Sequence, residues 1–229
     1  MKKAVIILVA FCFAVNIYGQ NNNVKNLVNQ GIALHDEGNF KAAIEKYQKA
    51  LSIEPKNSWA NYELSYTYFA MQDYDNAIKF SELSIKYDKN ATAYIVLGNS
   101  LDLKGNTAKA LKIYKKALKQ FPNEYMLNYN FALTCFNQKK YDDAQKAAVN
   151  AITNNPKHAS SHLILSSIMQ VKGEKIKSLL PLYYFLMLEP NSQRSEKSYN
   201  TLNNILYSGV EKKDDKNITI LQGTKQSKN

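Results

Sequence analysis

The sequence predicts an all-α fold, a right-handed α-solenoid of about five helical hairpins. Two observations support this prediction: the chain repeats itself, and the apolar residues of each copy follow helical spacing. The residue after the central turn recurs as Ala43, Ala77, Ala110, Ala144 and Ser178, at steps of 34, 33, 34 and 34 residues. One deletion, just before Ala91, accounts for the short step.

Each copy has the pattern of two helices joined by a tight turn. Residues 107–120 place apolar side chains on one helical stripe, at Ala110, Ile113, Tyr114, Ala117 and Leu118. Residues 91–104 show similar spacing and end at Gly105, where a glycine can close a helix in the left-handed conformation. One hairpin cannot bury both stripes, so the hairpins must stack, and we expect Gly98 and Ala110 to face each other at a close contact.

These residues resemble the tetratricopeptide repeat family. Residues 24–57 match its pattern at Gly31, Gly38, Phe40, Ala43, Tyr47, Ala50 and Pro55. Residues 91–124 match it at Leu97, Gly98, Leu101, Gly105, Ala110, Tyr114, Ala117 and Pro122. The copies at 58–90, 125–158 and 159–192 depart from it, with Ser65, Ala132 and Ser166 in place of the packing glycine. The resemblance covers residues 24–192 and implies a fold rather than an activity.

The first nineteen residues have the layout of a secretory signal peptide. Lys2 and Lys3 precede an apolar run, and Gly19 offers a small residue at the expected cut, so the mature chain should begin near Gln20. An uncleaved membrane anchor is the alternative, but the run is shorter than the roughly 20 residues that span a bilayer. A lipoprotein reading through Cys12 is disfavoured because the cysteine comes early and follows bulky Phe11.

The cysteines and histidines indicate neither a disulfide nor a metal site. Removal of the leader leaves Cys135 alone, which excludes an intramolecular disulfide, and its inward place predicts a buried small hydrophobe. His158 and His162 lie four residues apart, yet no carboxylate or cysteine completes a ligand set at short spacing, so we expect no metal and no cofactor. Known nucleophile, zinc-protease, phosphate-loop and dinucleotide motifs are missing from the sequence, which disfavours an enzyme.

The chain is basic, with a formal net charge of +11. Loss of Lys2 and Lys3 with the leader leaves an excess of +9. The lysines are spread over the outer faces of second helices, as at Lys41, Lys46, Lys49, Lys112, Lys115, Lys116, Lys119 and Lys146. A solvated outer face is the main interpretation, with peripheral contact to anionic lipid or acidic glycan as the alternative. The export signal and the lack of a recognised module argue against nucleic acid.

By analogy with the family, a ligand would lie in the groove lined by the first helix of each hairpin. The side of these helices opposite the buried stripe carries Trp59, Tyr62, Tyr66, Phe69, Asn99, Asp102, Tyr129, Leu133 and Phe136. An aromatic row with scattered amides suits an extended peptide, a partner helix or a sugar chain. The alternative is that several of these rings pack between hairpins, because a one-residue error in helix rotation exchanges groove and core.

The C-terminal part is expected to end the solenoid. Residues 179–188 are apolar throughout, and Pro181 should bend this helix near its start. Residues 193–208 predict a capping helix that covers Leu182 and Phe185 with Tyr199, Leu202 and Leu206. Residues 209–229 form a polar tail in which 218–221 resembles a strand without a partner.

The sequence therefore predicts an exported, non-catalytic repeat scaffold of a Gram-negative cell envelope that binds a protein or peptide partner. A glycan-binding accessory protein for nutrient capture is the alternative function. The leader and the composition rich in Lys, Asn, Ile and Tyr resemble those of secreted repeat proteins of the Bacteroidetes.

Overall fold

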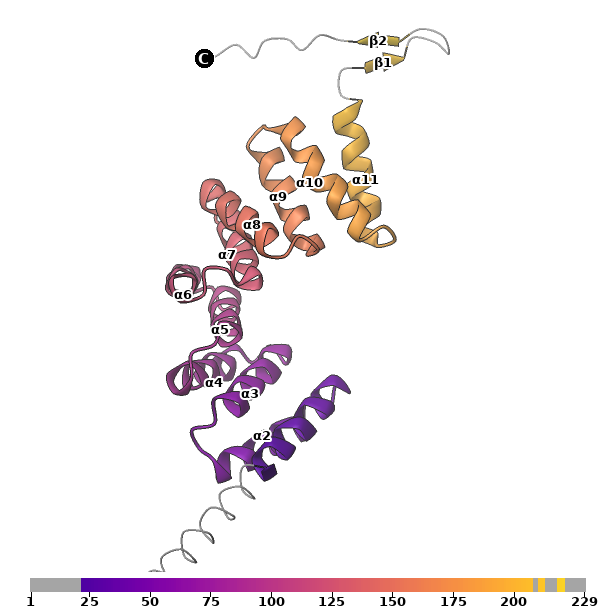
Figure 1. Ribbon diagram of the computed structural model, residues 1–229. Coiled ribbons are helices and arrows are strands. Elements are labelled where there is room, and N and C mark those ends of the chain that lie inside the picture. The colour runs from indigo at the N-terminus through magenta and orange to yellow at the C-terminus, as the bar shows by residue number, and fades with distance from the viewer. Residues whose placement is uncertain (1–21, 208–209, 213–217, 221–229) are drawn as a thin grey trace, which may run out of the picture. The chain divides into compact units, whose positions relative to one another are not determined.

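The computed structural model describes residues 22–207, 210–212 and 218–220, and within them it is built from antiparallel helices (Figure 1). Residues 22–36 are helical. The helices that follow are α2 (Phe40–Ile53), α3 (Ser58–Ala70), α4 (Tyr74–Tyr87), α5 (Ala91–Leu103), α6 (Thr107–Gln120), α7 (Tyr125–Asn137), α8 (Tyr141–Asn154), α9 (Ala159–Val171), α10 (Lys175–Leu188) and α11 (Gln193–Leu206). The expected signal peptide, residues 1–19, lies outside the described residues.

The chain divides into two compact units, with the boundary inside α7 between Thr134 and Cys135. In the first unit α2 packs on α3, α3 on α4, α4 on α5 and α5 on α6. In the second unit α8 packs on α9, α9 on α10 and α10 on α11. Packing of each helix on its chain neighbours is the arrangement of an all-α solenoid, which is the fold class that the repeats predict.

The five hairpin turns share one backbone geometry. In each turn the second residue after the helix has a positive φ, and these residues are Gly38, Gln72, Gly105, Lys139 and Gly173. Two backbone hydrogen bonds close each turn, as from Gly105 to Asp102 at 2.9 Å and from Asn106 to Leu101 at 2.8 Å. This is the Schellman pattern, and glycine adopts it without the cost that Gln72 (φ 61°) and Lys139 (φ 57°) incur.

Asparagine or aspartate side chains start many of the helices. The side chains of Asn39, Asn57, Asp73 and Asn90 each accept a hydrogen bond from the backbone N–H of the third residue after them. This contact satisfies one of the N–H groups that a helix start leaves without an intrahelical partner. The sequence thus sets the helix starts as well as the helix ends.

The close approach inside the first and third hairpins is between glycine and tyrosine. A Cβ on Gly98 would lie 2.4 Å from Cζ of Tyr114, and a Cβ on Gly31 would lie 2.4 Å from Cε1 of Tyr47. The close contact expected between Gly98 and the second helix is made by the buried ring of Tyr114, one turn further along α6 than Ala110.

The departures from the glycine pattern follow from the same contact. At the tyrosine place the second, fourth and fifth copies carry Ser81, Ala148 and Leu182. Their glycine places hold Ser65, Ala132 and Ser166, and all three of these are fully buried. Because no ring enters these hairpins, a small side chain is accommodated where the first and third copies need glycine.

The second unit ends with α10 and α11. Helix α10 buries Ser178, Pro181, Leu182 and Phe185 and runs through Pro181. Helix α11 covers it with Leu202 and Ile205, which are buried. The expectation that Tyr199 and Leu206 belong to this cover is wrong, since both are exposed. At 100° per residue the two side chains lie within about 60° of Leu202, at one edge of the buried stripe, and this edge of α11 stays exposed.

Beyond α11, β1 (Val210–Lys212) pairs with β2 (Ile218–Ile220) in an antiparallel ladder in which Val210 is opposite Ile220 (Figure 1). The strand expected to lack a partner therefore has one within its own chain. Within the described part of the chain, no helix has both the length and the apolar character needed to cross a membrane.

Candidate ligand-binding face

The first helices of the hairpins lie next to one another in the first unit. Helix α3 contacts α5, although α4 separates them in sequence. A hydrogen bond of 2.8 Å joins Nδ1 of His35, in the helix 22–36, to Oγ1 of Thr67 in α3. Oγ1 of Thr134 in α7 donates to Asp102 in α5 over 3.0 Å. We call the outward surface of helix 22–36, α3, α5 and α7 up to Thr134 the A-helix face.

These two bonds occupy equivalent places. His35 and Asp102 are 67 residues apart, as are Thr67 and Thr134, which corresponds to two repeats. A threonine of the second or fourth copy thus binds a polar side chain at the end of the preceding first helix. The two contacts join helix 22–36 to α3 and α5 to α7, so first helices are held together in these two pairs.

The nine side chains predicted for the groove all remain outside the buried core. Trp59, Tyr66 and Leu133 are exposed. Tyr62, Phe69, Asn99, Asp102, Tyr129 and Phe136 are partly exposed. Eight of the nine belong to the first unit, whereas Phe136 lies in the second unit.

Aromatic rings are concentrated at one place on this face. The rings of Tyr62 and Tyr66 are nearly parallel, at 14° with centroids 6.3 Å apart. The ring of His35 stacks on Tyr66 at 5.0 Å, and Trp59 donates its indole N–H to Glu63 over 2.9 Å. We call His35, Trp59, Tyr62, Glu63 and Tyr66 the aromatic cluster.

Two members of the cluster were missed from the sequence. Asp102 was predicted to line the groove, and His35 occupies the equivalent place two repeats earlier in the sequence. The repeat period could therefore have predicted His35 as well. Glu63 lies one helical turn after Trp59, the spacing at which side chains meet on a helix. A search of the helix faces for Trp, Tyr and Phe finds neither His35 nor Glu63.

Burial makes the cluster less charged than its residue types suggest. Burial raises the pKa of the Glu63 carboxyl, with a smaller opposing effect from the Trp59 hydrogen bond. Burial lowers the pKa of His35, with the nearby Asp36 charge opposing it. The pKa of Tyr62 is raised, also chiefly by burial. An aromatic surface with one partly buried carboxyl suits a ligand with apolar groups and a hydrogen-bond donor.

Asn99 and Asp102 contribute to the structure of the face. Asn99 Oδ1 accepts a hydrogen bond from the Tyr114 hydroxyl at 2.5 Å. Asp102 accepts from Thr107 at 2.6 Å and from Thr134 at 3.0 Å. Both oxygens of this carboxylate already receive a donor, so Asp102 positions its neighbours.

Phe69 and Phe136 close their own hairpins. Phe69 packs on Tyr74 with centroids 5.9 Å apart at 56°, and Phe136 packs on Tyr141 at 5.8 Å and 58°. The two pairs are related by the 67-residue period and differ little in geometry. Each ring joins the end of one helix to the start of the next.

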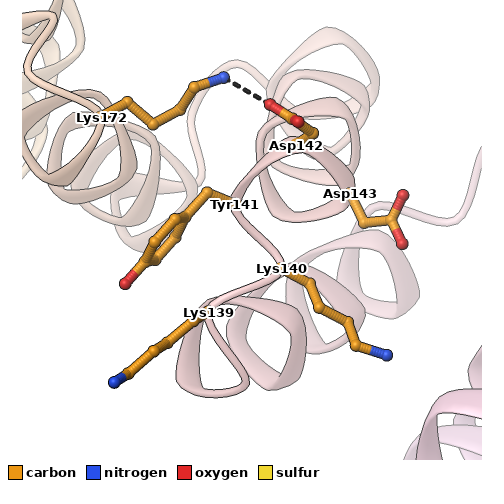
Figure 2. A pocket seen from close by; sticks show the side chains of 6 residues that line it. All are labelled: Lys139, Lys140, Tyr141, Asp142, Asp143 and Lys172. Atoms are coloured by element: carbon orange, nitrogen blue, oxygen red, sulfur yellow. Dashed lines mark hydrogen bonds and ion pairs between the residues drawn. The ribbon is translucent and has the colours of Figure 1, made fainter. Parts of the chain in front are cut away.

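A shallow depression of about 340 Å³ in the second unit is lined by charged side chains (Figure 2). Lys172 Nζ binds Asp142 and Gln145, each at 2.7 Å. Lys139 and Lys140 point away from this pair and from each other in Figure 2. The ion pair lowers the pKa of Asp142 and raises that of Lys172. Lys104 and Asp75 form the equivalent ion pair in the first unit, so this contact is a repeated structural feature.

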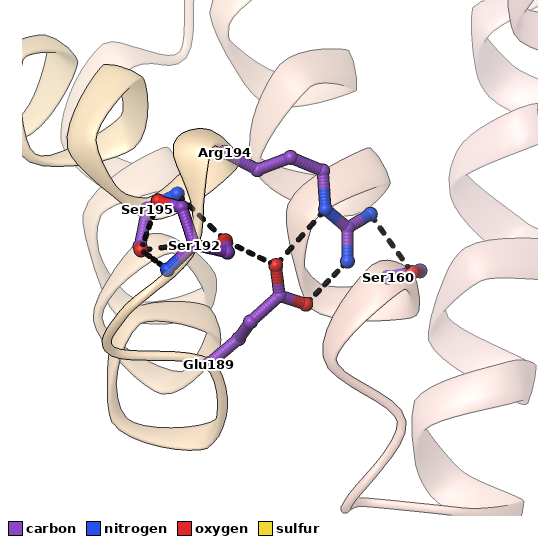
Figure 3. A network of polar contacts seen from close by, with 5 residues as sticks. All are labelled: Ser160, Glu189, Ser192, Arg194 and Ser195. Atoms are coloured by element: carbon purple, nitrogen blue, oxygen red, sulfur yellow. Dashed lines mark hydrogen bonds and ion pairs between the residues drawn. The ribbon is translucent and has the colours of Figure 1, made fainter.

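The start of α11 is fixed by a polar network (Figure 3). Arg194 binds Glu189 with two nitrogens and donates to Ser160 Oγ at 3.1 Å. Ser192 also donates to Glu189, and Ser192 and Ser195 form a reciprocal capping box. The network fastens α11 to α9 and the end of α10.

The two histidines considered for a metal have local partners. His158 Nδ1 lies 2.7 Å from Ser161 Oγ, and His162 Nε2 lies 2.8 Å from the carbonyl oxygen of Pro156. Among the side chains that the structure describes, no three of the His, Cys, Asp or Glu type gather in a way that could hold a metal ion. Cys135 is buried, in agreement with its expected inward place.

Comparison with protein families agrees with this architecture. Residues 34–96 match the family model described as tetratricopeptide repeat. Residues 70–151 match the model described as anaphase-promoting complex, cyclosome, subunit 3. The chain belongs to the tetratricopeptide repeat (TPR) family. The matched residues, 34–151, begin in the first unit and end in the second.

The sequence relatives of this TPR chain are longer proteins. BBSome complex member BBS4 of Bos taurus is 29% identical over 137 residues, which are 60% of this chain and 26% of that protein. TPR repeat-containing protein MJ1428 of Methanocaldococcus jannaschii is 25% identical over 178 residues, 71% of this chain and 30% of that protein. The chain thus spans less than a third of these relatives.

Solved TPR structures share the fold. The structure of Pseudomonas aeruginosa PilF has a TM-score of 0.71 at 18% identity and covers 83% of this chain and 95% of its own. YrrB, described as a TPR protein with an unusual peptide-binding site, has a TM-score of 0.59 at 18% identity and covers 82% and 97%. At such low identity the likeness concerns the fold.

Proposed function

We propose that the chain is an exported, non-catalytic TPR scaffold of a Gram-negative cell envelope that binds a protein or peptide partner through its A-helix face. The observation that carries the proposal is the aromatic cluster, in which four rings and one carboxyl are held on the outward side of two adjacent first helices. Flat rings contribute large contact area at low entropy cost, which is why such residues are common in binding surfaces.

The network beneath the cluster supports a binding role. His35 is hydrogen-bonded to Thr67 and stacked on Tyr66, so the exposed ring of Tyr66 is already oriented before a ligand arrives. A preorganised surface loses less conformational freedom on association. YrrB, which is described as having a peptide-binding site, shares the fold.

The proposed setting rests on the sequence of the leader. Two lysines, an apolar run and Gly19 are the layout of a segment that directs export. The absence of nucleophile, metal-protease and phosphate-loop motifs supports a scaffold in place of an enzyme.

A glycan is the second candidate ligand, favoured by one observation. The rings of Tyr62 and Tyr66 are within 14° of parallel, and parallel rings can present a flat platform to a sugar. The aromatic cluster is the same in both cases, so the ligand class is an outcome of the experiment.

The test uses the chain from Gln20 to Asn229 as bait for a random-peptide display library and for a glycan array. The variant Tyr62→Ala with Tyr66→Ala removes the two parallel rings, and Tyr199→Ala removes an exposed ring on α11 as the matched control. Enriched peptides should bind the double variant at least about tenfold more weakly and the control equally well.

Thermal unfolding of all three proteins keeps the result interpretable. Tyr66 is exposed and Tyr62 is partly exposed, so the double variant should remain folded with a similar midpoint. Equal peptide affinity of a folded double variant would contradict the site, and selective binding to glycans would replace the peptide with a sugar.

A further inference from the structure

Helix α10 carries an apolar stripe on its outward side. Ile176, Leu180, Tyr183 and Met187 are 75%, 68%, 51% and 73% exposed. With 100° between successive residues, the four lie within about 60° of one another on the helix. The buried residues Ser178, Pro181, Leu182 and Phe185 occupy the opposite side. A contiguous exposed apolar patch of this kind marks an interaction surface.

The spacing within the stripe is that of a helix-to-helix seam. Its members follow one another at four, three and four residues, which is the alternation of the inward positions in a coiled coil. Such a seam fits a second helix with the same spacing better than it fits an irregular segment. We propose that α10 pairs with α10 of a second copy of this chain, antiparallel about a two-fold axis that passes between Pro181 and Leu182.

The stripe is complementary to itself in this register. Ile176 faces Met187 of the second copy, and Leu180 faces Tyr183 of the second copy. The same two contacts recur on the other side of the axis, as a two-fold interface requires. All four apolar side chains are thereby covered without a shift of register.

The residues beside the stripe also agree with the antiparallel direction. On one side Leu179 comes to lie along Leu186 of the second copy, and both are partly buried already. On the other side Lys177 comes to lie along Tyr184 of the second copy, where its aliphatic stem and ammonium can pack on the ring.

Charge favours the antiparallel direction. Lys175 and Lys177 stand at the start of α10, where Lys177 forms an ion pair with Glu174 at 2.8 Å, and a parallel pair would bring the lysines of both copies together. An antiparallel pair places them near the C-terminal end of the other helix, where the backbone carbonyls favour cations.

The interface is small, so the dimer is weak. A helix of 14 residues is about 21 Å long. One such helix pair buries less than a standard interface of about 1,600 Å², so we expect a dissociation constant in the micromolar range.

The test introduces opposite charges at two side chains that face each other across the two-fold axis. Dimerisation is measured by sedimentation equilibrium at protein concentrations of roughly 5 to 500 µM, a range that brackets the expected dissociation constant. The chain from Gln20 to Asn229 is compared with Leu180→Glu, with Tyr183→Lys and with the double variant. Leu103→Lys, at an exposed apolar residue of α5, is the matched control.

Each single variant should weaken the dimer at least about tenfold, because it leaves a charge against an apolar side chain. The double variant should recover most of the loss, since each new ammonium then faces the new carboxylate of the other copy. In a parallel pair each new charge would face the same charge on the other copy, so the double variant would dimerise even more weakly than the single variants. The α5 control should dimerise normally.

Three results would overturn the proposal. The first is a monomer at every concentration. The second is a double variant no better than the single variants while its circular dichroism stays unchanged. The third is a monomer that binds phosphatidylglycerol vesicles through the stripe, which would assign it to a lipid surface.

Discussion

The contact between Gly98 and Tyr114 predicts that one substitution, Gly98→Ala, destabilises the natural chain but stabilises a variant that lacks the Tyr114 ring. Replacing a glycine inside a helix with alanine ordinarily stabilises the helix by about 1 kcal/mol. At Gly98 the new Cβ would lie 2.4 Å from Cζ, 2.7 Å from Cε1 and 2.8 Å from the hydroxyl oxygen of Tyr114. The ring is fully buried and its hydroxyl is bound to Asn99, so it has little room to move.

Overpacking of this kind costs about 1 to 3 kcal/mol, and a cost of about 2 kcal/mol exceeds the gain in helix propensity. We therefore expect Gly98→Ala to lower the free energy of unfolding by about 1 kcal/mol. In a Tyr114→Leu background, which carries the residue of the fifth copy at this place, the same substitution should raise it by about 1 kcal/mol.

The assay is a double-mutant cycle in urea, followed by circular dichroism and by the fluorescence of Trp59, because repeat arrays can unfold in steps. The cycle should give a coupling of about 2 kcal/mol. A stabilising Gly98→Ala in the natural background would refute the reasoning, since it would mean that Tyr114 yields without cost.

Three further predictions concern other places. Gln72→Gly should stabilise the chain by about 0.5 kcal/mol, because it relieves the positive φ at 61°; an unchanged urea midpoint would contradict this. Because burial raises the pKa of Glu63 in the fold, its ionisation opposes folding above that pKa and this effect fades as pH falls. Glu63→Gln should therefore raise the melting temperature more at pH 7.5 than at pH 4.5, and equal shifts would argue against it. N-terminal sequencing of the exported protein should begin at or near Gln20; an intact Met1 in a membrane fraction would indicate an anchor.

The candidate site was partly predictable. Helical spacing placed Trp59, Tyr62 and Tyr66 on the outward side of their helix, and the structure leaves them outside the core. The same spacing could not show that Phe69 would close on Tyr74, or that His35 would stack on Tyr66. Those contacts join separate helices, and periodicity within one helix carries no information on them.

The sequence by itself determined the repeat, the helix pairs and their turns. These features are local: a helical stripe, an asparagine cap and a glycine turn each need only a few neighbouring residues. The tertiary structure decided which side chains meet. It placed Tyr114 on Gly98, turned Tyr199 outward and gave β2 a partner in β1, because each depends on how separate elements rotate and pack against one another.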